Sequence, residues 1–461
     1  DHTHELEHGH HNATGGWHDA GDYGKYTSNT AFTLGVMMYA WEHFEDRLAC
    51  ADLGLGRPGG VPDYLDEVRW GLEWILKMQR EDGAAWHKLT PPGFASLVAL
   101  PNDDDSTRYM SPVSTAATAF LAACAAQAHR VFSAHDPALA RRALEVADRA
   151  WGFLEAHPEQ IRPDLSAFRT GTYDDDGPMS DLDARFWAAT ELFESTGRRA
   201  YLDKAEELIR RFDSQSPLCG LLGEGETAQP EACKVCHLTD WYRPRNLGVV
   251  RYLTLTDARA RDADLEAEIK EQLRGVVDDM ARHSQRSAYG NSLGFVKWGV
   301  NGELARQSLV LFAAEAVLGR NATLEATGLN TLARLLGRNE WGRSMVTKVG
   351  VHPPEHPHHR PSLAFHDAWP GYLVGGPYPG ENSWSDSWLA FKSNEVAINW
   401  QAGLAYATAR YFTAPTGCPP HAAKPVELEH RLAADTGRGR RGDARVPSSR
   451  IRHRSRGGRG S

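Results

Sequence analysis

Two short segments carry the carboxylates of this chain that could do chemistry. Near the start, residues 17–26 read Trp-His-Asp-Ala-Gly-Asp-Tyr-Gly-Lys-Tyr and set Asp19 and Asp22 three residues apart. Near the end, Glu395 opens the segment Glu-Val-Ala-Ile-Asn-Trp. Glycoside hydrolysis uses two such carboxyl groups, one protonated to donate to the leaving oxygen and one ionised to attack or to activate water. The two segments are therefore candidates for the halves of a glycosidase site.

The two segments give their carboxyl groups different settings. Gly21 and Gly24 allow backbone conformations that bring Asp19 and Asp22 close to a ligand, and an ordinary aspartate is ionised near neutral pH. Glu395 is followed by an apolar run, and burial among apolar residues raises a carboxyl pKa, as a general acid requires. Simpler interpretations stay open. The aspartates could cap a helix or bind calcium, and Glu395 could be a first-turn carboxylate that interacts with a helix dipole.

Asp22 and Glu395 lie near opposite ends of the chain, so a fold must bring them together. Apolar residues at three- and four-residue spacing predict helices, and alternating patterns typical of strands are scarce. The predicted helices are residues 28–46, 63–80, 113–133, 138–156, 181–196, 199–213, 243–255, 263–283, 302–318, 323–338 and 394–412. This pattern predicts an all-α body. Long loops rich in Gly, Pro and Asp separate some of these helices, and such loops usually carry function.

The charge of the chain is uneven. The formal net charge is −9, yet residues 414–461 carry ten Arg and one Lys against four acidic residues, about +7. The rest of the chain is therefore strongly acidic, which argues against nucleic acid or an anionic membrane as a partner. No stretch of roughly 18 apolar residues occurs, so no membrane-spanning helix is predicted. The 14 Trp offer flat faces that can stack on sugar rings.

Three regions follow from these patterns. Residues 1–14 are rich in His, and we interpret them as a truncated start because no initiating Met or signal peptide precedes the first motif. Residues 15–413 form the helical body. Residues 414–461 are rich in Arg, Gly and Pro and are expected to be disordered, with a polyanion-binding arm as the alternative. The six cysteines, at positions 50, 124, 219, 233, 236 and 418, leave the cellular compartment open.

Three segments together resemble a known family. They are residues 15–26 with the Asp-Ala-Gly-Asp sequence, residues 344–360 ending in Pro-His-His-Arg, and residues 384–397 with Asp386 and Glu395. In this order and spacing, residues 15–413 resemble glycoside hydrolase family 9, the inverting cellulase family. The resemblance implies that Asp22 is the general base, that Asp19 helps it hold the nucleophilic water, and that Glu395 is the proton donor. It also implies a set of substrate-binding residues: His358, Arg360, Trp400, Asp386 and Tyr23.

The resemblance implies a fold and an activity as well. The fold would be an (α/α)6 barrel of twelve helices, with the twelfth expected within residues 361–393. The activity would be that of an inverting endo-β-1,4-glucanase on cellulose and related β-glucans, with no cofactor for chemistry. A secreted monomer, extracellular or periplasmic, with no nucleic acid or membrane partner, is expected. Two alternatives stay open: an exo-acting β-glucosidase or exo-β-glucosaminidase on the same scaffold, and a carbohydrate-binding relative without activity.

Structural metals are a separate question. The acidic loop at residues 174–183, with Asp181 and Asp183, offers oxygen ligands for calcium. The resemblance implies zinc as an alternative, because many bacterial relatives bind zinc through the histidine that is His18 in this chain. No cysteine precedes residue 50, so His18 would need other ligands, for which the sequence offers His8, His10 and His11.

The loop before residue 240 contains a Cys-x-x-Cys-His pattern, from Cys233 to His237. This pattern is the one that attaches c-type haem. Together with Cys219, the residues Cys233, Cys236 and His237 could instead form a tetrahedral zinc site. Disulfides and free thiols are the remaining interpretations.

Overall fold

The computed structural model describes residues 2–5, 10–55, 60–171, 180–212, 233–378 and 384–414. Contacts group Asp1–His421 into one compact unit, which contains all of these residues. The predicted C-terminal tail lies outside the described residues from position 415 onward, as do Cys219, His8 and the acidic residues 174–176.

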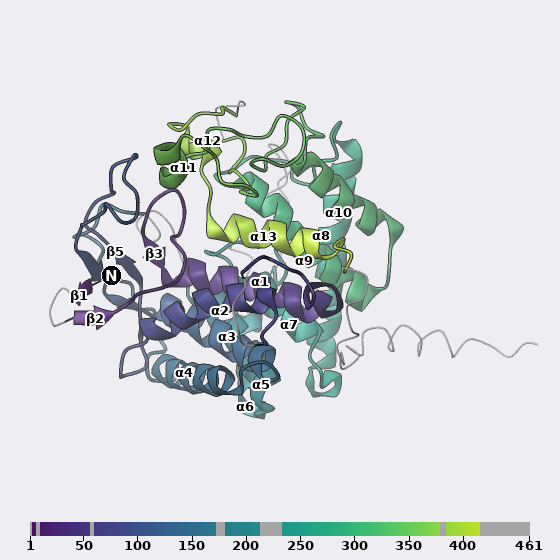
Figure 1. Cartoon of the computed structure of the whole chain (residues 1–461). Helices are drawn as coiled ribbons and strands as arrows, with labels where there is room; N and C mark the ends of the chain where they lie inside the picture. The colour runs from purple at the N-terminus through teal and green to yellow at the C-terminus, as the bar shows by residue number, and fades with distance from the viewer. Residues whose placement is uncertain are drawn as a thin grey trace, which may run out of the picture. The chain divides into compact units, whose positions relative to one another are not determined.

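Helices make up most of the described chain (Figure 1). The long ones are α1 (Thr27–Leu48), α2 (Asp63–Ile75), α3 (Thr115–Phe132), α4 (Pro137–Ala156), α5 (Leu182–Thr196), α6 (Arg199–Arg210), α7 (Arg245–Leu253), α8 (Ala263–Arg286), α9 (Val300–Leu318), α10 (Ala322–Leu335) and α13 (Ile398–Ala409). Short 3-10 turns follow α2 at Leu76–Met78 and α7 at Ala258–Ala260. Every helix predicted from the spacing of apolar residues is confirmed, with ends displaced by up to five residues.

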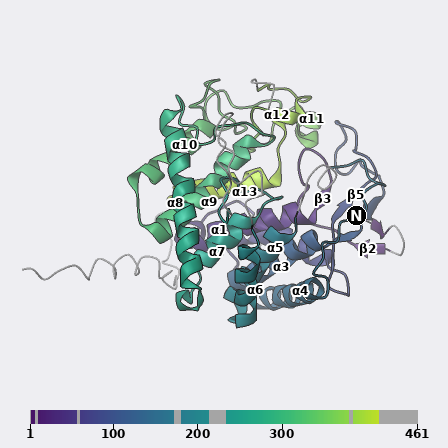
Figure 2. The same ribbon diagram turned by 180° about the vertical axis from the view of Figure 1, so that it is seen from behind.

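Six helices close a ring. α1, α3, α5, α7 and α9 contact one another in that order, α13 contacts α9, and α13 also contacts α1. Figure 1 shows α13 beside α1, and Figure 2 shows α3, α5 and α7 from behind. The other long helices lie against this ring: α2 on α1, α4 on α3, α6 on α5, and α8 and α10 on α9. This is the arrangement expected of an (α/α)6 barrel.

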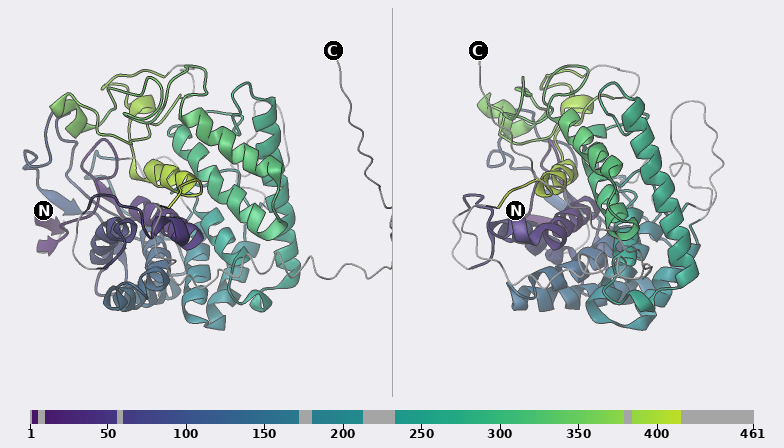
Figure 3. Two further views of the ribbon diagram at one scale, coloured as in Figure 1. Left: turned by 45° about the vertical axis from the view of Figure 1, so that its right-hand side comes forward. Right: turned by 90° about the vertical axis from the view of Figure 1, so that its right-hand side faces the viewer.

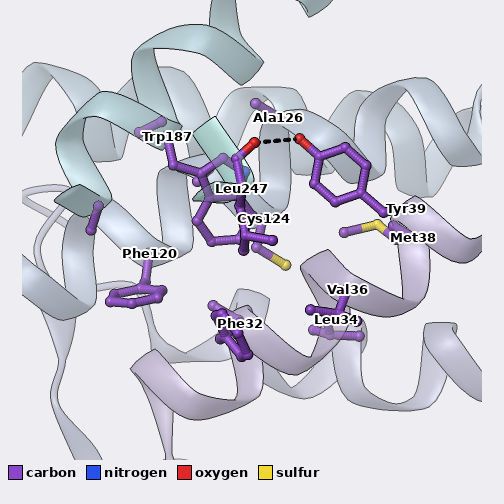
Figure 4. Packing of buried hydrophobic residues seen from close by; sticks show 14 of the residues in the cluster. Phe32, Leu34, Val36, Met38, Tyr39, Phe120, Cys124, Ala126, Trp187 and Leu247 are labelled. Atoms are coloured by element: carbon purple, nitrogen blue, oxygen red, sulfur yellow. Dashed lines mark hydrogen bonds between the residues drawn. The ribbon is translucent and has the colours of Figure 1, made fainter. Parts of the chain in front are cut away.

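The ring helices are buried on almost every side, which their sequences explain. α3 is rich in Ala and has only two charged or histidine side chains, both in its last turn, whereas α6 and α8 carry charged residues along one face. A helix that is apolar all round belongs in a core, and an amphipathic helix covers it. Figure 4 shows Phe32, Phe120 and Trp187 from three ring helices in one cluster, where Tyr39 donates a hydrogen bond to the carbonyl O of Leu247 (2.9 Å).

The twelfth helix of the barrel was expected within residues 361–393, and the described part of that segment has no helix of comparable length to the other eleven. This described part holds only α11 (Arg360–Phe365) and α12 (Phe391–Asn394). Pro370, Gly371, Gly375, Gly376 and Pro377 interrupt the stretch between them, and Pro and Gly disfavour helix interiors. The segment is instead a long loop region that gathers, with α11, at one end of the helix ring (Figure 3).

Short strands accompany the helices, and the sequence patterns did not predict them. One sheet has the order β2-β1-β6-β5-β3, and β4 pairs with β7. Their bounds are β1 His2–Glu5, β2 His10–Asn12, β3 Lys25–Tyr26, β4 Ala85–Trp86, β5 Lys88–Thr90, β6 Arg108–Met110 and β7 Val113–Ser114. Strands of two to four residues are too short to show an alternating pattern. The segment interpreted as a truncated start, residues 1–14, thus contributes β1 and β2 to the sheet.

The sheet matters for function because β3 joins the Asp-Ala-Gly-Asp loop to α1. Antiparallel pairing of β3 with β5 holds the end of that loop in place. Among the described helices, none combines the length and the apolar character that crossing a membrane requires.

Candidate active site

The Asp-Ala-Gly-Asp loop is a tight turn held by its own hydrogen bonds. The backbone N–H of Asp19 donates to the carbonyl O of Gly24 (2.9 Å), and Asn29 Nδ2 donates to Asp19 Oδ1 (2.6 Å). Asp22 Oδ2 accepts from the N–H of Gly24 (3.2 Å) and from the hydroxyl of Tyr26 (3.4 Å). Both aspartates are buried. The residue that precedes α1 is Tyr26, so the interpretation of these aspartates as caps of that helix is wrong.

Glu395 reaches the same place from the other end of the chain. The N–H of Ile398 donates to the carbonyl O of Asp19 (2.9 Å), and His358 and Glu395 form a parallel bridge. A Cβ on Gly21 would lie 2.4 Å from the carbonyl O of His358 and 3.3 Å from Glu395 Oε1. No side chain fits in that space, so glycine at position 21 is what lets the three segments meet.

The sequence predicted that Glu395 lies in a helix at residues 394–412, but Glu395 lies between two helices. α12 ends at Asn394, α13 begins at Ile398, and Glu395 has extended backbone angles (φ −69°, ψ 159°). The interpretation of Glu395 as a first-turn carboxylate of α13 is therefore wrong. Extended backbone at this position places the carboxyl group beside the Asp-Ala-Gly-Asp loop.

The three carboxylates line one cavity of about 800 Å³. Its wall also holds aromatic side chains from loops far apart in the sequence, together with three cations. The lining residues that bear on function are Asp19, Asp22, Tyr26, Phe94, Arg169, Asp240, Trp241, Tyr242, Lys297, Trp298, His358, Arg360, Phe391, Glu395 and Trp400. A concave site with aromatic walls and converging carboxylates is the usual form of a binding site for a small molecule or a sugar chain.

Burial and charge separate the protonation behaviour of the two carboxyl groups. Burial raises the pKa of Glu395 well above its usual value, and the neighbouring charges of Asp22 and Asp19 raise it further. Burial also raises the pKa of Asp22, but the N–H of Gly24 and the charge of Arg360 oppose this. The proton is therefore held at Glu395 and more readily lost from Asp22. The sequence argument rested on apolar neighbours of Glu395, and the structure adds the two aspartate charges.

His358 and Arg360 both line the cavity, as predicted. His358 Nδ1 is hydrogen-bonded to the carbonyl O of Trp388, which leaves Nε2 as an acceptor in the neutral ring. The Arg360 guanidinium donates to the carbonyl O of Gly21 and, through Nε (3.2 Å) and Nη2 (3.0 Å), to that of Ala95. Arg360 thus holds two loops of the cavity wall together, which the sequence did not foresee.

Asp386 and Tyr23 are not among the residues that line this cavity. Asp386 accepts hydrogen bonds from the backbone N–H groups of Glu355 (2.9 Å) and His356 (2.8 Å), so it orients the segment that leads to His358. The hydroxyl of Tyr23 donates to a carbonyl O of the loop before β6, at Ala99 (2.6 Å). Both residues thus bind backbone groups of nearby loops.

Trp400 lines the cavity and is itself buried. Three glycines leave space for its ring. A Cβ on Gly302 would lie 2.2 Å from Trp400 Cδ1, a Cβ on Gly299 would lie 2.5 Å from Trp400 Cε2, and a Cβ on Gly375 would lie 3.1 Å from Trp400 Cη2. The indole is therefore fixed by close packing against glycine backbone.

Several lining residues were missed by the sequence argument. Tyr26 lay inside the quoted motif, and its ring is pressed against Gly171, where a Cβ would lie 2.3 Å from the Tyr26 hydroxyl O. Trp241, Tyr242 and Trp298 stand in or beside the long loops that were expected to carry function. Adjacent aromatics in such a loop were a usable signal, whereas nothing local showed that they face one cavity.

The described residues do not fit a structural metal site. No group of three or more His, Cys, Asp or Glu side chains within the described ranges is arranged to hold a metal ion. Burial lowers the pKa of His18 to about 3, and the charges of Lys25 and Arg108 lower it further. Two cations beside the ring disfavour zinc there. His11, proposed as a substitute ligand, is hydrogen-bonded through Nε2 to the carbonyl O of Lys77 (2.9 Å).

The acidic residues proposed as calcium ligands form ion pairs with arginines. Asp181 pairs with Arg185 (2.9 Å) and Asp183 with Arg245 (2.9 Å), so arginine occupies the carboxylates that were candidates for calcium.

Around the Cys-x-x-Cys-His pattern, Cys233 Sγ donates to the carbonyl O of Val235 (2.9 Å), Cys236 is buried, and His237 Nε2 lies 3.2 Å from Asp279 Oδ2. The zinc and disulfide interpretations, which include Cys219, stay predictions because Cys219 lies outside the described residues. The haem interpretation of Cys233, Cys236 and His237 also stays a prediction.

Residues 1–408 match the profile of glycosyl hydrolase family 9. The chain belongs to this family. It is 36% identical over 405 residues to Endoglucanase D of Acetivibrio thermocellus, covering 87% of this chain and 61% of that protein. It is 32% identical to a xyloglucan-specific endo-beta-1,4-glucanase of Bacteroides ovatus, covering 84% of this chain and 67% of that protein.

Solved structures of family 9 enzymes also resemble this chain. A structure of AaCel9A in complex with cellobiose-like isofagomine superposes with a TM-score of 0.79 at 28% identity, covering 89% of this chain and 78% of that one. Family 9 proteins are (α/α)6 barrels, which confirms the predicted fold class. Their chemistry needs no cofactor. The chain spans about three fifths of the length of Endoglucanase D.

Proposed function

We propose that this chain is an inverting endo-β-1,4-glucanase. The observation that carries the proposal is the shared cavity of Asp22 and Glu395, in which burial and two aspartate charges keep the proton on Glu395. A general acid and a general base with separated proton affinities are what glycoside hydrolysis requires. Membership of family 9 and the endoglucanase names of its relatives support the same activity.

The proposed mechanism is a single displacement. Asp22, with Asp19 beside it, accepts a proton from a water molecule as the water oxygen attacks the anomeric carbon. Glu395 donates its proton to the glycosidic oxygen as the bond to that carbon breaks. Attack from the face opposite to the leaving group inverts the configuration at the anomeric carbon. After turnover, Glu395 must regain a proton and Asp22 must lose one, and both exchange with solvent through the open cavity.

Other lining residues bind the chain in this proposal. His358 Nε2 accepts a hydrogen bond from a sugar hydroxyl, and Arg360 directs its remaining N–H groups to sugar oxygens. Trp400 and the loop aromatics stack on the apolar faces of glucose rings. The substrate is therefore a β-1,4-linked glucan, and the named substrate of the Bacteroides ovatus relative makes xyloglucan worth testing beside cellulose.

The setting of the protein is part of the proposal. Cys50 is disulfide-bonded, and disulfides persist in oxidising compartments. We place the protein outside the cytoplasm, in the extracellular space or the periplasm, where polymeric glucan is found. It acts as a monomer, since one chain supplies all of the proposed catalytic groups.

The deciding experiment uses carboxymethyl-cellulose and cellohexaose. Endo action lowers the viscosity of carboxymethyl-cellulose before many reducing ends appear, and early NMR spectra of cellohexaose products show the α-anomer. Release of glucose with little loss of viscosity would replace the proposal with an exo-acting β-glucosidase, and release of glucosamine from chitosan hexaose without cleavage of cellohexaose would replace it with an exo-β-glucosaminidase. Binding of cellohexaose without any cleavage would replace it with a carbohydrate-binding protein.

A further inference from the structure

A second group of buried charges lies beside the proposed catalytic carboxylates, and the mechanism does not use it. It consists of Asp240, Lys297, Glu303 and Arg306, two acids and two bases. Glu303 and Arg306 are fully buried, and Asp240 is 4% exposed. Asp240 and Lys297 line the same cavity as Asp22 and Glu395. Buried charges are costly unless they are paired, so their presence at a binding wall calls for a function.

The four side chains form one connected network. Lys297 Nζ pairs with Asp240 Oδ2 and lies 3.5 Å from Glu303 Oε2. Arg306 Nη2 lies 3.2 Å from Asp240 Oδ1 and 3.1 Å from Glu303 Oε2. Each carboxylate thus faces both cations. Asp240 and Lys297 are the members that connect the network to the cavity wall.

Asp240 begins a closed turn. The N–H of Arg243 donates to the carbonyl O of Asp240 (2.8 Å), and the N–H of Asp240 donates to the carbonyl O of Arg243 (3.4 Å). The two residues between them are Trp241 and Tyr242, and both line the cavity. Asp240 Oδ1 also accepts from the N–H of Trp241 (2.9 Å). The Lys297 ammonium lies 5.0 Å from the centre of the Tyr242 ring, within range of a cation–π contact.

The network also reaches the segment that carries Glu395. Asn399 Nδ2 donates to Asp240 Oδ1 (3.3 Å), and Arg306 Nη1 donates to the carbonyl O of Asn399 (3.1 Å). The turn at residues 240–243 is therefore fixed to α9 through Arg306 and to the start of α13 through Asn399. Its aromatic pair is held at a set position relative to the proposed proton donor.

We propose that Asp240 and Lys297 are positioning residues that hold Trp241 and Tyr242 as a stacking wall for the glucan chain. The inference rests on the proposed glucanase activity and adds residues that bind substrate without taking part in bond breaking. The ion pair acts through the two rings. Its loss lets the turn move, which weakens binding of sugar rings and leaves the catalytic carboxylates as they are.

The first test is Lys297→Met, because Lys297 lies at the cavity and is the most accessible member of the network. We expect KM for cellohexaose to rise about tenfold, near the effect of one lost aromatic contact, with kcat within about threefold of wild type. Lys297→Arg keeps the charge and should restore KM. Lys270→Met is the matched control, since Lys270 pairs with Glu266 on α8, and its KM should not change.

A double-mutant cycle with Trp241→Ala separates positioning from general stability. If Lys297 acts through the turn, Lys297→Met should raise KM little further once Trp241 is removed. Independent effects that multiply to about a hundredfold would overturn the proposal. A fall in kcat at unchanged KM would also overturn it, as would a KM change in Lys270→Met of equal size.

Binding in the Glu395→Gln background provides an independent measurement. The dissociation constant of cellohexaose, from calorimetry, should rise in Lys297→Met by the same factor as KM. An unchanged constant would reject the stacking wall. If the wild type binds cellohexaose but does not cleave it, the proposed function fails, while this ratio of binding constants still tests the wall.

Discussion

Two groups of carboxylates among the described residues, one between the ring helices and one in the cavity, behave in opposite ways. In the core, Glu42 and Glu191 are surrounded by Arg130 and Arg251. In the cavity, where Asp19 lies beside them, Asp22 and Glu395 have Arg360 as the cation that lowers their pKa values. Glu191, Asp19 and Asp22 are buried, and Glu42 and Glu395 are partly buried. The difference between the two groups is the number of cations that compensate the carboxylates.

The pKa values follow from that difference. Burial alone would raise the pKa of Glu42, but the charges of Arg251 and Arg130 outweigh it and lower the value to about 2. For Glu395 the negative charges of Asp22 and Asp19 add to the effect of burial, and the opposing charge of Arg360 does not cancel them. A compensated carboxylate stabilises the fold, and an uncompensated one keeps a proton available for chemistry.

The largest expected effect comes from removing the acid of the uncompensated cluster. Glu395→Gln keeps the shape of the side chain but cannot donate a proton as an acid, so kcat on cellohexaose should fall by about 10³-fold or more. Binding of cellohexaose should persist. The exposed Glu355→Gln serves as control and should retain the wild-type rate. A Glu395→Gln rate within tenfold of wild type would reject Glu395 as the proton donor.

The compensated cluster should respond through stability. Glu191→Gln leaves Arg130 and Arg251 short of a buried partner, and the free energy of unfolding should fall by about 3–5 kcal/mol. Urea denaturation measures this, while kcat per folded molecule should not change. Glu145→Gln, on the exposed face of α4, should cost less than about 0.5 kcal/mol. Equal losses in the two variants would show that the core cluster does not stabilise the fold.

Stability should move the other way when the uncompensated cluster is neutralised. A carboxyl group whose pKa is raised in the folded state contributes stability below its unfolded pKa and loses it as pH rises through the folded pKa. Near neutral pH, Glu395→Gln should therefore leave the protein as stable as wild type or stabilise it by about 0.5–2 kcal/mol. Thermal unfolding at pH 7 measures this change. A clear loss of stability would mean that Glu395 is compensated by groups not considered above.

The smallest effect concerns the hydroxyl of Tyr26. It donates to Asp22 Oδ2 and favours the ionised form of that carboxyl group, so Tyr26→Phe should raise the pKa of Asp22. The acidic limb of kcat/KM should then move to higher pH, by less than about one unit. A shift to lower pH, or a shift of the basic limb alone, would contradict the assignment of Asp22 as the base.

Much of the fold was readable from the sequence. Apolar residues at helical spacing predicted all of the long helices, because a helix that is buried on one or all sides must repeat its apolar positions every three to four residues. The strands were not predicted because two to four residues are too few to show the alternation of apolar and polar residues. The twelfth helix was expected because the family fold has twelve helices. The prolines and glycines between residues 366 and 390 disfavour a helix there.

For the site, the sequence by itself determined which carboxylates are present and which segments carry them. It could not determine that Glu395 stands in extended backbone, that Arg360 bonds two loops, or that Asp240 and Lys297 join the cavity wall. These features depend on backbone segments that meet only in the folded chain, at Gly21 and at the start of α13. Residue types set the available chemistry. Tertiary structure alone decided which charges are compensated, because compensation depends on distance in space.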